Sequence, residues 1–124
     1  MSTQRKTRQR RAIWKAIQTA GRPLSPQEVL ELARAEVPQL GLATVYRRLN
    51  ALVNGEEIRA VELPGESTRY EPADLAHHHH FICTRCTKAF DMEGCMLKHE
   101  LTLPPGFKVT SHEITLSGTC PDCA

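Results

Sequence analysis

The sequence predicts an α+β fold with two parts, a winged helix-turn-helix over residues 1–72 and a small α/β dimerisation domain over residues 73–124. Apolar residues recur at helical spacing in three segments before residue 54, and two short strand patterns follow them. The second part carries two Cys-x-x-Cys pairs, a spacing that lets four thiolates hold one tetrahedral zinc ion. Two parts this small bury little apolar surface, so we expect a structural metal or a dimer interface to stabilise them.

The first two predicted helices have clear local signals. The first covers residues 8–20, with Ile13 and Ile17 on one face. The second begins where Ser25 can cap the first turn and Glu28 can complete a capping box. These two helices precede the segment that is expected to contact DNA.

The third predicted helix, residues 43–53, has a polar side suited to reading DNA. Val45, Leu49 and Leu52 face inward at helical spacing. The outward side carries Thr44, Tyr46, Arg47, Arg48 and Asn50. In a helix-turn-helix such a helix enters the major groove, where arginine reads guanine edges or contacts phosphate, and tyrosine contacts a thymine methyl group or a phosphate.

A predicted hairpin over residues 58–63 and 67–71 completes the winged pattern. Charge favours a polyanionic partner, because residues 1–59 carry 11 Lys and Arg against 5 Asp and Glu, whereas residues 60–124 carry 5 against 9. A solvated basic face is the alternative interpretation. The basic leader that could follow the DNA backbone or a minor groove comprises Arg5, Lys6, Arg8, Arg10 and Arg11.

The second part is predicted to form a small sheet with one helix. Strands are expected over residues 79–83 and 88–92, a helix over residues 94–103, and further strand structure between Phe107 and Leu116. The edge of such a sheet is a natural place for a second copy of the chain to pair. We therefore predict a homodimer.

The two cysteine pairs are Cys83 with Cys86 and Cys120 with Cys123. Structural zinc held by all four thiolates is the favoured interpretation. A thioredoxin-like redox pair lacks the expected strand-and-helix scaffold around one motif, and ordinary disulfides are rare in the cytoplasm. We expect that compartment, because the polar start of the chain is no signal peptide and no apolar run is long enough to span a membrane.

A run of four histidines precedes the first cysteine pair. Alternate side chains of a strand face opposite ways, so His78 and His80 share one face, and His77 and His79 share the other. Each face can contribute two imidazoles to a different metal site. The alternative is a solvated polar loop whose histidines bind nothing in the cell.

Other potential ligands flank the histidines. Glu71 and Asp91 would complete the first face as a mixed nitrogen and oxygen set, which suits Fe(II), Mn(II) or Zn(II) as a regulatory ion. The second face could gain His112 and His99. Cys95 has no assigned partner, and it is interpreted as a packed thiol, a ligand or a redox-reactive residue.

Three motifs together resemble those of the ferric uptake regulator (Fur) superfamily, namely Gly41-Leu-Ala-Thr-Val-Tyr-Arg-Arg-Leu-Asn50, His77-His-His-His-Phe-Ile-Cys-x-x-Cys86 and Cys120-x-x-Cys123. The likeness runs from about Thr7 to Cys123, in the order and approximate spacing of the family. It implies a dimeric bacterial transcription regulator that binds AT-rich inverted repeats of double-stranded DNA when loaded with metal. Such regulators repress genes for metal uptake or oxidative-stress defence.

The resemblance also assigns residues to sites. It implies structural zinc at the four paired cysteines, a regulatory ion at Glu71, His78, His80 and Asp91, a second site with His77, His79 and His112, and DNA reading by Thr44, Tyr46 and Arg47. Some positions depart from the family pattern. Pro23 replaces a regulatory histidine of many members, for which Glu62 could substitute. Lys98 replaces a glutamate of the second site, for which His99 could substitute. Asp91, where many iron sensors have glutamate, resembles the peroxide sensors of the family.

The sequence therefore supports the hypothesis of a metal-gated DNA switch, in which an ion fixes the angle between the two domains. A thiol-disulfide redox protein and a metal store or chaperone without DNA binding are the alternatives. The sequence contains no apparent hydrolase triad or phosphate-binding glycine loop, so we do not expect an enzyme.

Overall fold

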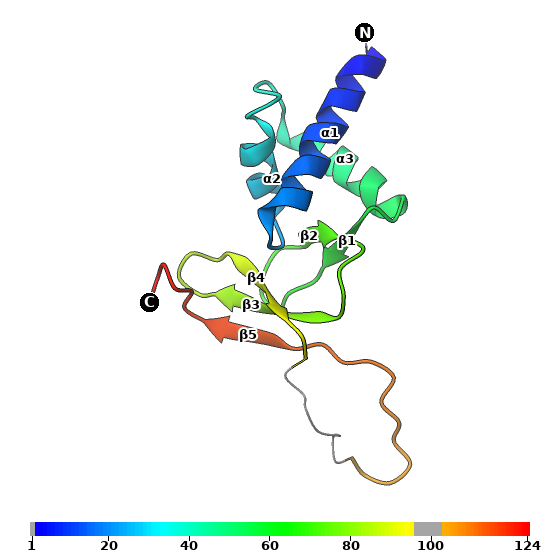
Figure 1. The fold of residues 1–124 in the computed structure, drawn as a ribbon, viewed down its shortest axis with the longest axis vertical. Helices are drawn as coiled ribbons and strands as arrows, with labels where there is room; N and C mark the ends of the chain where they lie inside the picture. Colours follow the sequence, from blue (N-terminus) through cyan, green and yellow to red (C-terminus); the bar gives the residue numbers. More distant parts are fainter. Residues whose placement is uncertain (1, 96–102) are drawn as a thin grey trace.

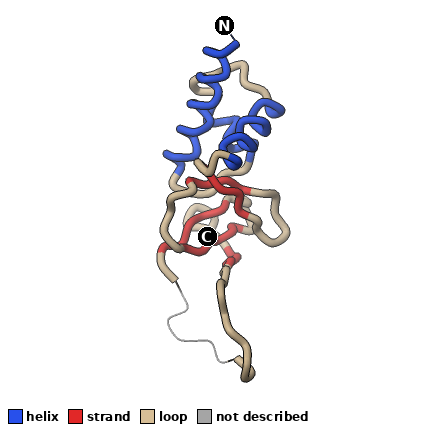
Figure 2. Tube along the Cα trace, turned by 90° about the vertical axis from the view of Figure 1, so that its right-hand side faces the viewer, coloured by secondary structure: helices blue, strands red, loops and turns tan. Residues whose placement is uncertain are grey.

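The computed structural model describes residues 2–95 and 103–124 and confirms the mixed helix and sheet fold. In chain order the elements are α1 (Ser2–Ala20), α2 (Pro26–Ala33), α3 (Leu42–Asn54), β1 (Ile58–Val61), β2 (Arg69–Pro72), β3 (His78–Cys83), β4 (Ala89–Glu93) and β5 (Thr115–Gly118). The helices gather at one end of the molecule, with β1 and β2 beneath them and β3 to β5 farther along (Figure 1). Figure 2 shows the same succession after a quarter turn.

The first helix is longer than the sequence predicts. It begins at Ser2 rather than at residue 8, so Arg5 and Lys6 lie on a helix and do not form an extended leader. Apolar periodicity marks only the half of α1 that packs, where Ile13 and Ile17 are buried. The polar first half contains Gln, Lys and Arg, which have high helix propensity, and it has no glycine or proline to stop the helix.

The predicted capping box at the start of α2 is confirmed. The backbone N–H of Glu28 donates to the Ser25 hydroxyl at 3.2 Å, and the backbone N–H of Ser25 donates to the Glu28 carboxylate at 2.9 Å. Pro26 occupies the first turn, where it costs no helical hydrogen bond. These contacts fix the turn between α1 and α2.

We expect the Ser25→Ala substitution to lower the free energy of unfolding by about 1 kcal/mol, because an orphan N–H at the helix start loses its acceptor. Urea unfolding followed by circular dichroism measures this change. Ser67→Ala removes the same hydroxyl at an exposed position and serves as the control. Equal stability of the two variants would contradict the capping role.

The third helix packs as predicted on one side. Val45, Leu49 and Leu52 are fully buried in the core shared with α1 and α2, whereas Tyr46 is exposed. The outward placement of Arg48 is wrong, because this side chain is half-buried and its Nε atom is buried without a hydrogen-bond partner in the described residues. Arg48 lies three residues after Val45, a spacing that brings it beside the apolar stripe.

The predicted hairpin is present with shorter strands. β1 and β2 are antiparallel, and Arg59 lies opposite Glu71 in their register. Leu24 and Tyr70 exchange two backbone hydrogen bonds of 2.9 and 2.8 Å, which attach the hairpin to the segment before α2. The three helices and this hairpin form the predicted winged arrangement.

The larger sheet has the order β4-β3-β5. β3 pairs antiparallel with β4 and parallel with β5. β3 and β4 correspond to the two strands that the sequence predicts over residues 79–83 and 88–92. The prediction of strand structure at Phe107 and Val109 is wrong, because pairing with β3 begins only at Thr115 and residues 103–111 are exposed. Most of the helix predicted over residues 94–103 lies outside the described residues. Among the helices of the described part, none is long and apolar enough to cross a membrane.

Candidate metal centres and nucleic-acid surface

The four paired cysteines come together from two turns that are distant in sequence. Their sulfur atoms all lie within 4.8 Å of one another. Cys86 Sγ and Cys120 Sγ are 3.8 Å apart, which is too long for a disulfide bond. A tetrahedral zinc ion with Zn–S bonds of about 2.3 Å holds its sulfur atoms about 3.8 Å apart. The donor set and its spacing therefore fit zinc.

The electrostatics of this cluster also favour a cation. Backbone N–H groups of Cys86 and Cys120, each 3.4 Å from Cys83 Sγ, point toward that sulfur. Hydrogen bonding, first from the Cys86 N–H, lowers the pKa of Cys83 to about 6. Hydrogen bonds involving Cys120 and Cys83 raise the pKa of Cys123 to about 12. One thiolate forms readily, but further negative charge in the cluster requires a positive ion.

Arg69 connects this cysteine cluster to the winged part, a role that the sequence alone did not indicate. The side chain is buried in β2, and its guanidinium donates to the Thr87 carbonyl at 2.9 Å, directly after Cys86. Glu28 and Glu66 lie 3.8 Å from the same guanidinium. Burying an arginine without partners would be costly, so a buried arginine indicates partners nearby. The sequence signal for this role was therefore a cation at an inward position of a predicted hairpin strand.

We expect Arg69→Ala to lower the free energy of unfolding by about 1–3 kcal/mol, because the Thr87 carbonyl and two carboxylates lose their partner. Thermal and urea unfolding of the zinc-loaded protein measure this loss. Arg11→Ala, which removes the same charge from an exposed position on α1, is the control. A loss no larger than that of the control would show that Arg69 does not connect the two parts.

A second cluster joins the two sheets. The structure brings together the four residues that the sequence singled out, Glu71 of β2, His78 and His80 of β3, and Asp91 of β4, with donor atoms within 4.8 Å of one another. His78 Nε2 is 2.9 Å from Glu71 Oε2, and His80 Nε2 is 3.3 Å from Glu71 Oε1. Asp91 Oδ1 lies 3.3 Å from His78 Nε2 and 3.4 Å from His80 Nε2.

The arrangement of hydrogen bonds fits a bound cation. His78 Nδ1 lies 2.7 Å from the Ala76 carbonyl, which accepts its N–H and leaves Nε2 directed into the cluster. His78 Nε2 and His80 Nε2 are only 3.2 Å apart. Asp91 Oδ1 is buried and has no hydrogen-bond partner within the described ranges. A divalent ion would satisfy both imidazole nitrogens and this oxygen together.

Charge in this cluster is unevenly distributed between its carboxylates. Burial raises the pKa of Glu71, but hydrogen bonds with His80 and His78 outweigh it and lower the pKa to about 2. Burial and the neighbouring charge of Glu71 raise the pKa of Asp91 to about 6. Burial lowers the pKa of His78, but the Ala76 carbonyl and Glu71 raise it overall. Glu71 is therefore the anchoring anion of the cluster, while Asp91 holds its proton more readily than Glu71 does.

Two further side chains clarify the limits of this cluster. Arg59 of β1, which the sequence analysis missed, donates from Nε to Glu71 Oε1 at 3.0 Å and orients that carboxylate. Its position opposite Glu71 in the hairpin register is the signal that could have found it. Glu62, the predicted substitute ligand, is exposed, accepts a hydrogen bond from Thr68 at 3.0 Å and does not belong to the cluster.

The opposite face of β3 also gathers potential ligands. His77, His79 and His112 come together as the sequence predicts, and Cys95 joins them. Burial, with the neighbouring His77 and His112, lowers the pKa of His79. His99, the other predicted member, lies outside the described residues. An open pocket of about 480 Å³, lined by all four consecutive histidines, gives solvent access to both faces.

The predicted DNA-reading residues occupy different environments. Tyr46 and Arg47 are exposed on α3, and Arg47 donates to the Thr44 hydroxyl at 2.9 Å. The Arg10 side chain forms an ion pair with Glu57, which lies between the end of α3 and the start of β1. The remaining cations at the start of the chain are exposed along one helix, and they are Arg5, Lys6, Arg8 and Arg11.

Known proteins are similar to this chain in sequence and in fold. The sequence profile of the ferric uptake regulator family matches residues 2–117. The ferric uptake regulation protein of Campylobacter jejuni is 34% identical over 123 residues, which cover 94% of this chain and 78% of that protein.

Two solved structures extend the comparison to three dimensions. The Helicobacter pylori ferric uptake regulator, described with three functional metal-binding sites, superposes with a TM-score of 0.67 and 26% sequence identity. The match covers 93% of this chain and 79% of the Helicobacter pylori chain. FurB of M. tuberculosis, described as a zinc uptake regulator, superposes with a TM-score of 0.53 and 29% sequence identity. The match covers 97% of this chain and 95% of the FurB chain.

Proposed function

The chain belongs to the ferric uptake regulator family of metal-responsive transcriptional regulators, and on this premise we propose that it represses metal-uptake or oxidative-stress genes when an ion occupies the Glu71, His78, His80 and Asp91 cluster. This cluster is the regulatory site of the proposal. Its ion is Fe(II), Mn(II) or Zn(II), which imidazole and carboxylate donors bind. The two alternative functions, a thiol-disulfide redox protein and a metal store, are not favoured, because the family that the chain matches consists of regulators.

One observation carries the proposal. Glu71 belongs to the hairpin of the winged part, residues 1–72, whereas His78, His80 and Asp91 belong to the sheet of residues 73–124. An ion bound by all four residues therefore connects the two proposed domains. If it binds the DNA-competent arrangement more tightly than the alternatives, it shifts the population toward that arrangement. Coupling of this kind is usually about 1–3 kcal/mol.

The four-cysteine cluster has a different role in this proposal. Cys83, Cys86, Cys120 and Cys123 would hold a structural zinc ion that ties the end of the chain to the turn after β3. Zinc bound by four thiolates supplies folding free energy to a part with a small core, because Ile82 and Ala89 are its only members of a buried apolar cluster that, among the described residues, also needs Val61 and Leu63 of the winged part.

The family is dimeric and binds DNA, and we propose an AT-rich inverted repeat as the operator. Phe107 is 68% and Val109 52% exposed, and Leu116 on the edge strand is also exposed. A second copy of the chain would cover these apolar side chains and place two α3 helices on successive major grooves. A repressor that reaches chromosomal DNA in this way works in the cytoplasm.

Selection of binding duplexes from a random pool tests the proposed function. The zinc-loaded protein is incubated with the pool in the presence of Mn(II) and, separately, after removal of loosely bound metal. We expect AT-rich inverted repeats to be enriched only with Mn(II). Enrichment that is the same in both arms, or absent from both, would contradict the proposal.

We expect Arg47→Ala to weaken binding to the selected duplex by about 1–3 kcal/mol, because the exposed guanidinium on α3 loses its contact with a base edge or phosphate. Fluorescence anisotropy in fixed salt measures the affinity. Lys88→Ala removes a positive charge from an exposed position just before β4, and its binding should match that of the unchanged protein. If Arg47→Ala also binds like the unchanged protein, α3 is not the reading helix.

A further inference from the structure

Arg59 places a positive charge directly beside the regulatory site. Its Nε donates to Glu71 Oε1 at 3.0 Å, and its Nη2 lies 3.3 Å from His78 Nδ1 and 3.5 Å from His78 Nε2. Glu71 and His78 both belong to that site. One guanidinium therefore contacts a residue from each proposed domain, Glu71 from the winged part and His78 from the sheet of residues 73–124.

We propose that Arg59 is an internal cation that opposes the regulatory ion and so sets the ion concentration at which the protein responds. This inference rests on the proposed function, because it concerns the ion of the same site. A guanidinium is always charged, and it offers N–H donors but no acceptor. Arg59 therefore acts on the affinity of the site without being one of its ligands.

The contacts with His78 bring the guanidinium close to any ion in the cluster. The Ala76 carbonyl accepts the Nδ1 N–H of His78, so Nε2 is the atom directed into the cluster. An ion bound to Nε2 at about 2.1 Å would lie no more than about 5.6 Å from Arg59 Nη2. Like charges at this separation repel, and a partly buried site weakens their repulsion less than bulk water does.

Glu71 is the carboxylate for which the two cations compete. Its side chain is 1% exposed, so its ionised form requires a positive partner. Arg59 supplies that partner from the neighbouring strand, where it lies opposite Glu71 in the hairpin register. Part of the free energy gained by neutralising Glu71 is therefore realised before an ion arrives. This arrangement lowers the affinity for the ion below that of the ligand set alone.

Arg59 also has space into which it can withdraw. Its side chain is 42% exposed, and it lines the open pocket of about 480 Å³ that reaches all four consecutive histidines. Solvent around this half-exposed side chain screens its charge, which keeps the effect modest. A cation within about 4–6 Å of a carboxylate commonly weakens proton binding by about 10- to 1000-fold, and we expect the lower end of this range for the ion.

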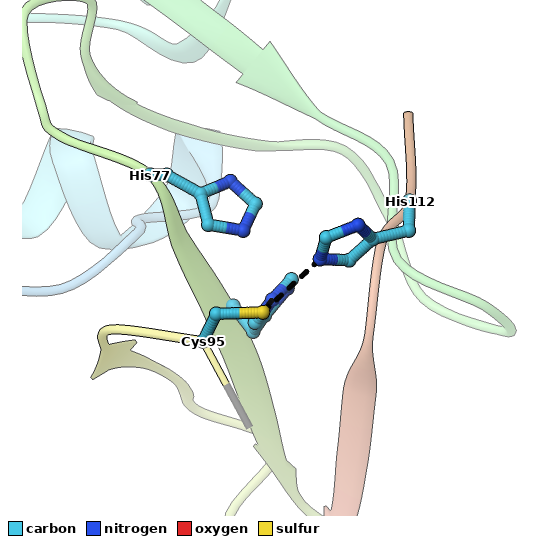
Figure 3. A group of neighbouring side chains, drawn as sticks. His77, Cys95 and His112 are labelled. Carbon is cyan, nitrogen blue, oxygen red and sulfur yellow. Dashed lines mark hydrogen bonds between the residues drawn. The ribbon is translucent and has the colours of Figure 1, made fainter. Parts of the chain in front are cut away.

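The opposite face of β3 provides an internal control, which is the group around Cys95. Figure 3 shows Cys95 and His112 joined by a hydrogen bond of 3.2 Å, with the His77 ring directed toward the same space. Within the described ranges, Arg59 forms no hydrogen bond with this group. The reactivity of Cys95 therefore reports whether a substitution of Arg59 disturbs β3 and its neighbours.

Calorimetric titration of Mn(II) into the zinc-loaded full chain, without DNA, tests the proposal. Arg59→Gln removes the charge but keeps an N–H donor for Glu71, whereas Arg59→Lys keeps the charge. We expect Arg59→Gln to bind Mn(II) about tenfold more tightly than the unchanged protein, and Arg59→Lys to bind much as the unchanged protein does. Arg11→Gln makes the same change of charge at an exposed position of α1 and should leave the affinity unchanged. His80→Ala should lose this binding, which assigns it to the regulatory site.

Thermal unfolding gives a second signature, which a purely structural role of Arg59 would not produce. Without Mn(II), Arg59→Gln should have a lower Tm than the unchanged protein, because the buried Glu71 carboxylate loses its cation. Addition of Mn(II) at one fixed concentration should raise Tm more in Arg59→Gln, because the more tightly bound ligand stabilises more. Alkylation of Cys95, followed by mass spectrometry, should proceed at the same rate in both proteins.

The proposal is overturned if Arg59→Gln binds Mn(II) no more tightly than the unchanged protein, or if Arg11→Gln gains as much affinity. A gain that accompanies altered Cys95 alkylation would also overturn it, because the cause would then be a change in β3. Any of these results would leave metal gating of DNA binding intact. Absence of Mn(II) binding from every variant and from the unchanged protein would overturn both proposals.

Discussion

Replacing Cys83 by serine is expected to unfold the second half of the chain, which is the largest effect that we predict. Cys83 is fully buried and accepts N–H groups from both cysteine turns. Structural zinc contributes about 10–16 kcal/mol of apparent folding free energy. Whole domains are stable by only about 5–15 kcal/mol. The folding free energy lost with this ion therefore exceeds what the small core of residues 73–124 can supply.

Zinc content, near-ultraviolet circular dichroism and sedimentation measure the outcome. Cys83→Ser should retain no tightly bound zinc, lose its fixed tertiary structure and fail to dimerise. Cys95→Ser makes the same substitution outside the four-cysteine cluster and should remain folded and dimeric with that zinc in place. A folded, dimeric Cys83→Ser protein without tightly bound zinc would exclude a structural role for the ion.

Replacing His80 by alanine is expected to remove the metal dependence of DNA binding while leaving the protein folded. His80 contacts both Glu71 and Asp91, so its loss leaves an incomplete ligand set between the two sheets. The unchanged protein should bind its duplex about 5–150-fold more tightly with Mn(II) than without it, the range that corresponds to common coupling energies. In His80→Ala this ratio should fall close to one.

The comparison requires a variant of the other histidine face. His112→Ala removes one imidazole from the opposite side of β3 and should keep the response to Mn(II). Anisotropy titrations of both variants, with and without Mn(II), provide the ratios. If His80→Ala responds to Mn(II) as strongly as His112→Ala does, the ion acts somewhere other than the regulatory site.

Local signals in the sequence predicted much of the fold. Ser25 and Glu28 form their capping box, and Val45, Leu49 and Leu52 form the buried stripe of α3, because both patterns depend on residues a few positions apart. The alternation of four histidines also separated His78 and His80 from His77 and His79, and the two pairs join different clusters at the start of β3. Strand geometry alone determines that outcome once the strand is assigned.

The sequence did not reveal contacts that depend on tertiary packing. Arg69 reaches the Thr87 carbonyl, and Arg59 orients Glu71, across distances that periodicity cannot register. Cys95 joins three histidines because the end of β4 lies beside the segment before β5. Phe107 and Val109 have the residue types of a strand, but strand structure also needs a neighbouring strand, and their segment has no such pairing in the described part of the chain.

Calorimetric titration of Mn(II) into the zinc-loaded protein, alone and bound to its selected duplex, tests the central claim most directly. Coupling is reciprocal, so if an ion at the regulatory site tightens DNA binding, DNA must tighten the binding of that ion by the same factor. We predict a tighter Mn(II) affinity in the complex, matching the ratio from anisotropy, at the site that His80→Ala removes. Identical Mn(II) affinities with and without the duplex would contradict metal gating.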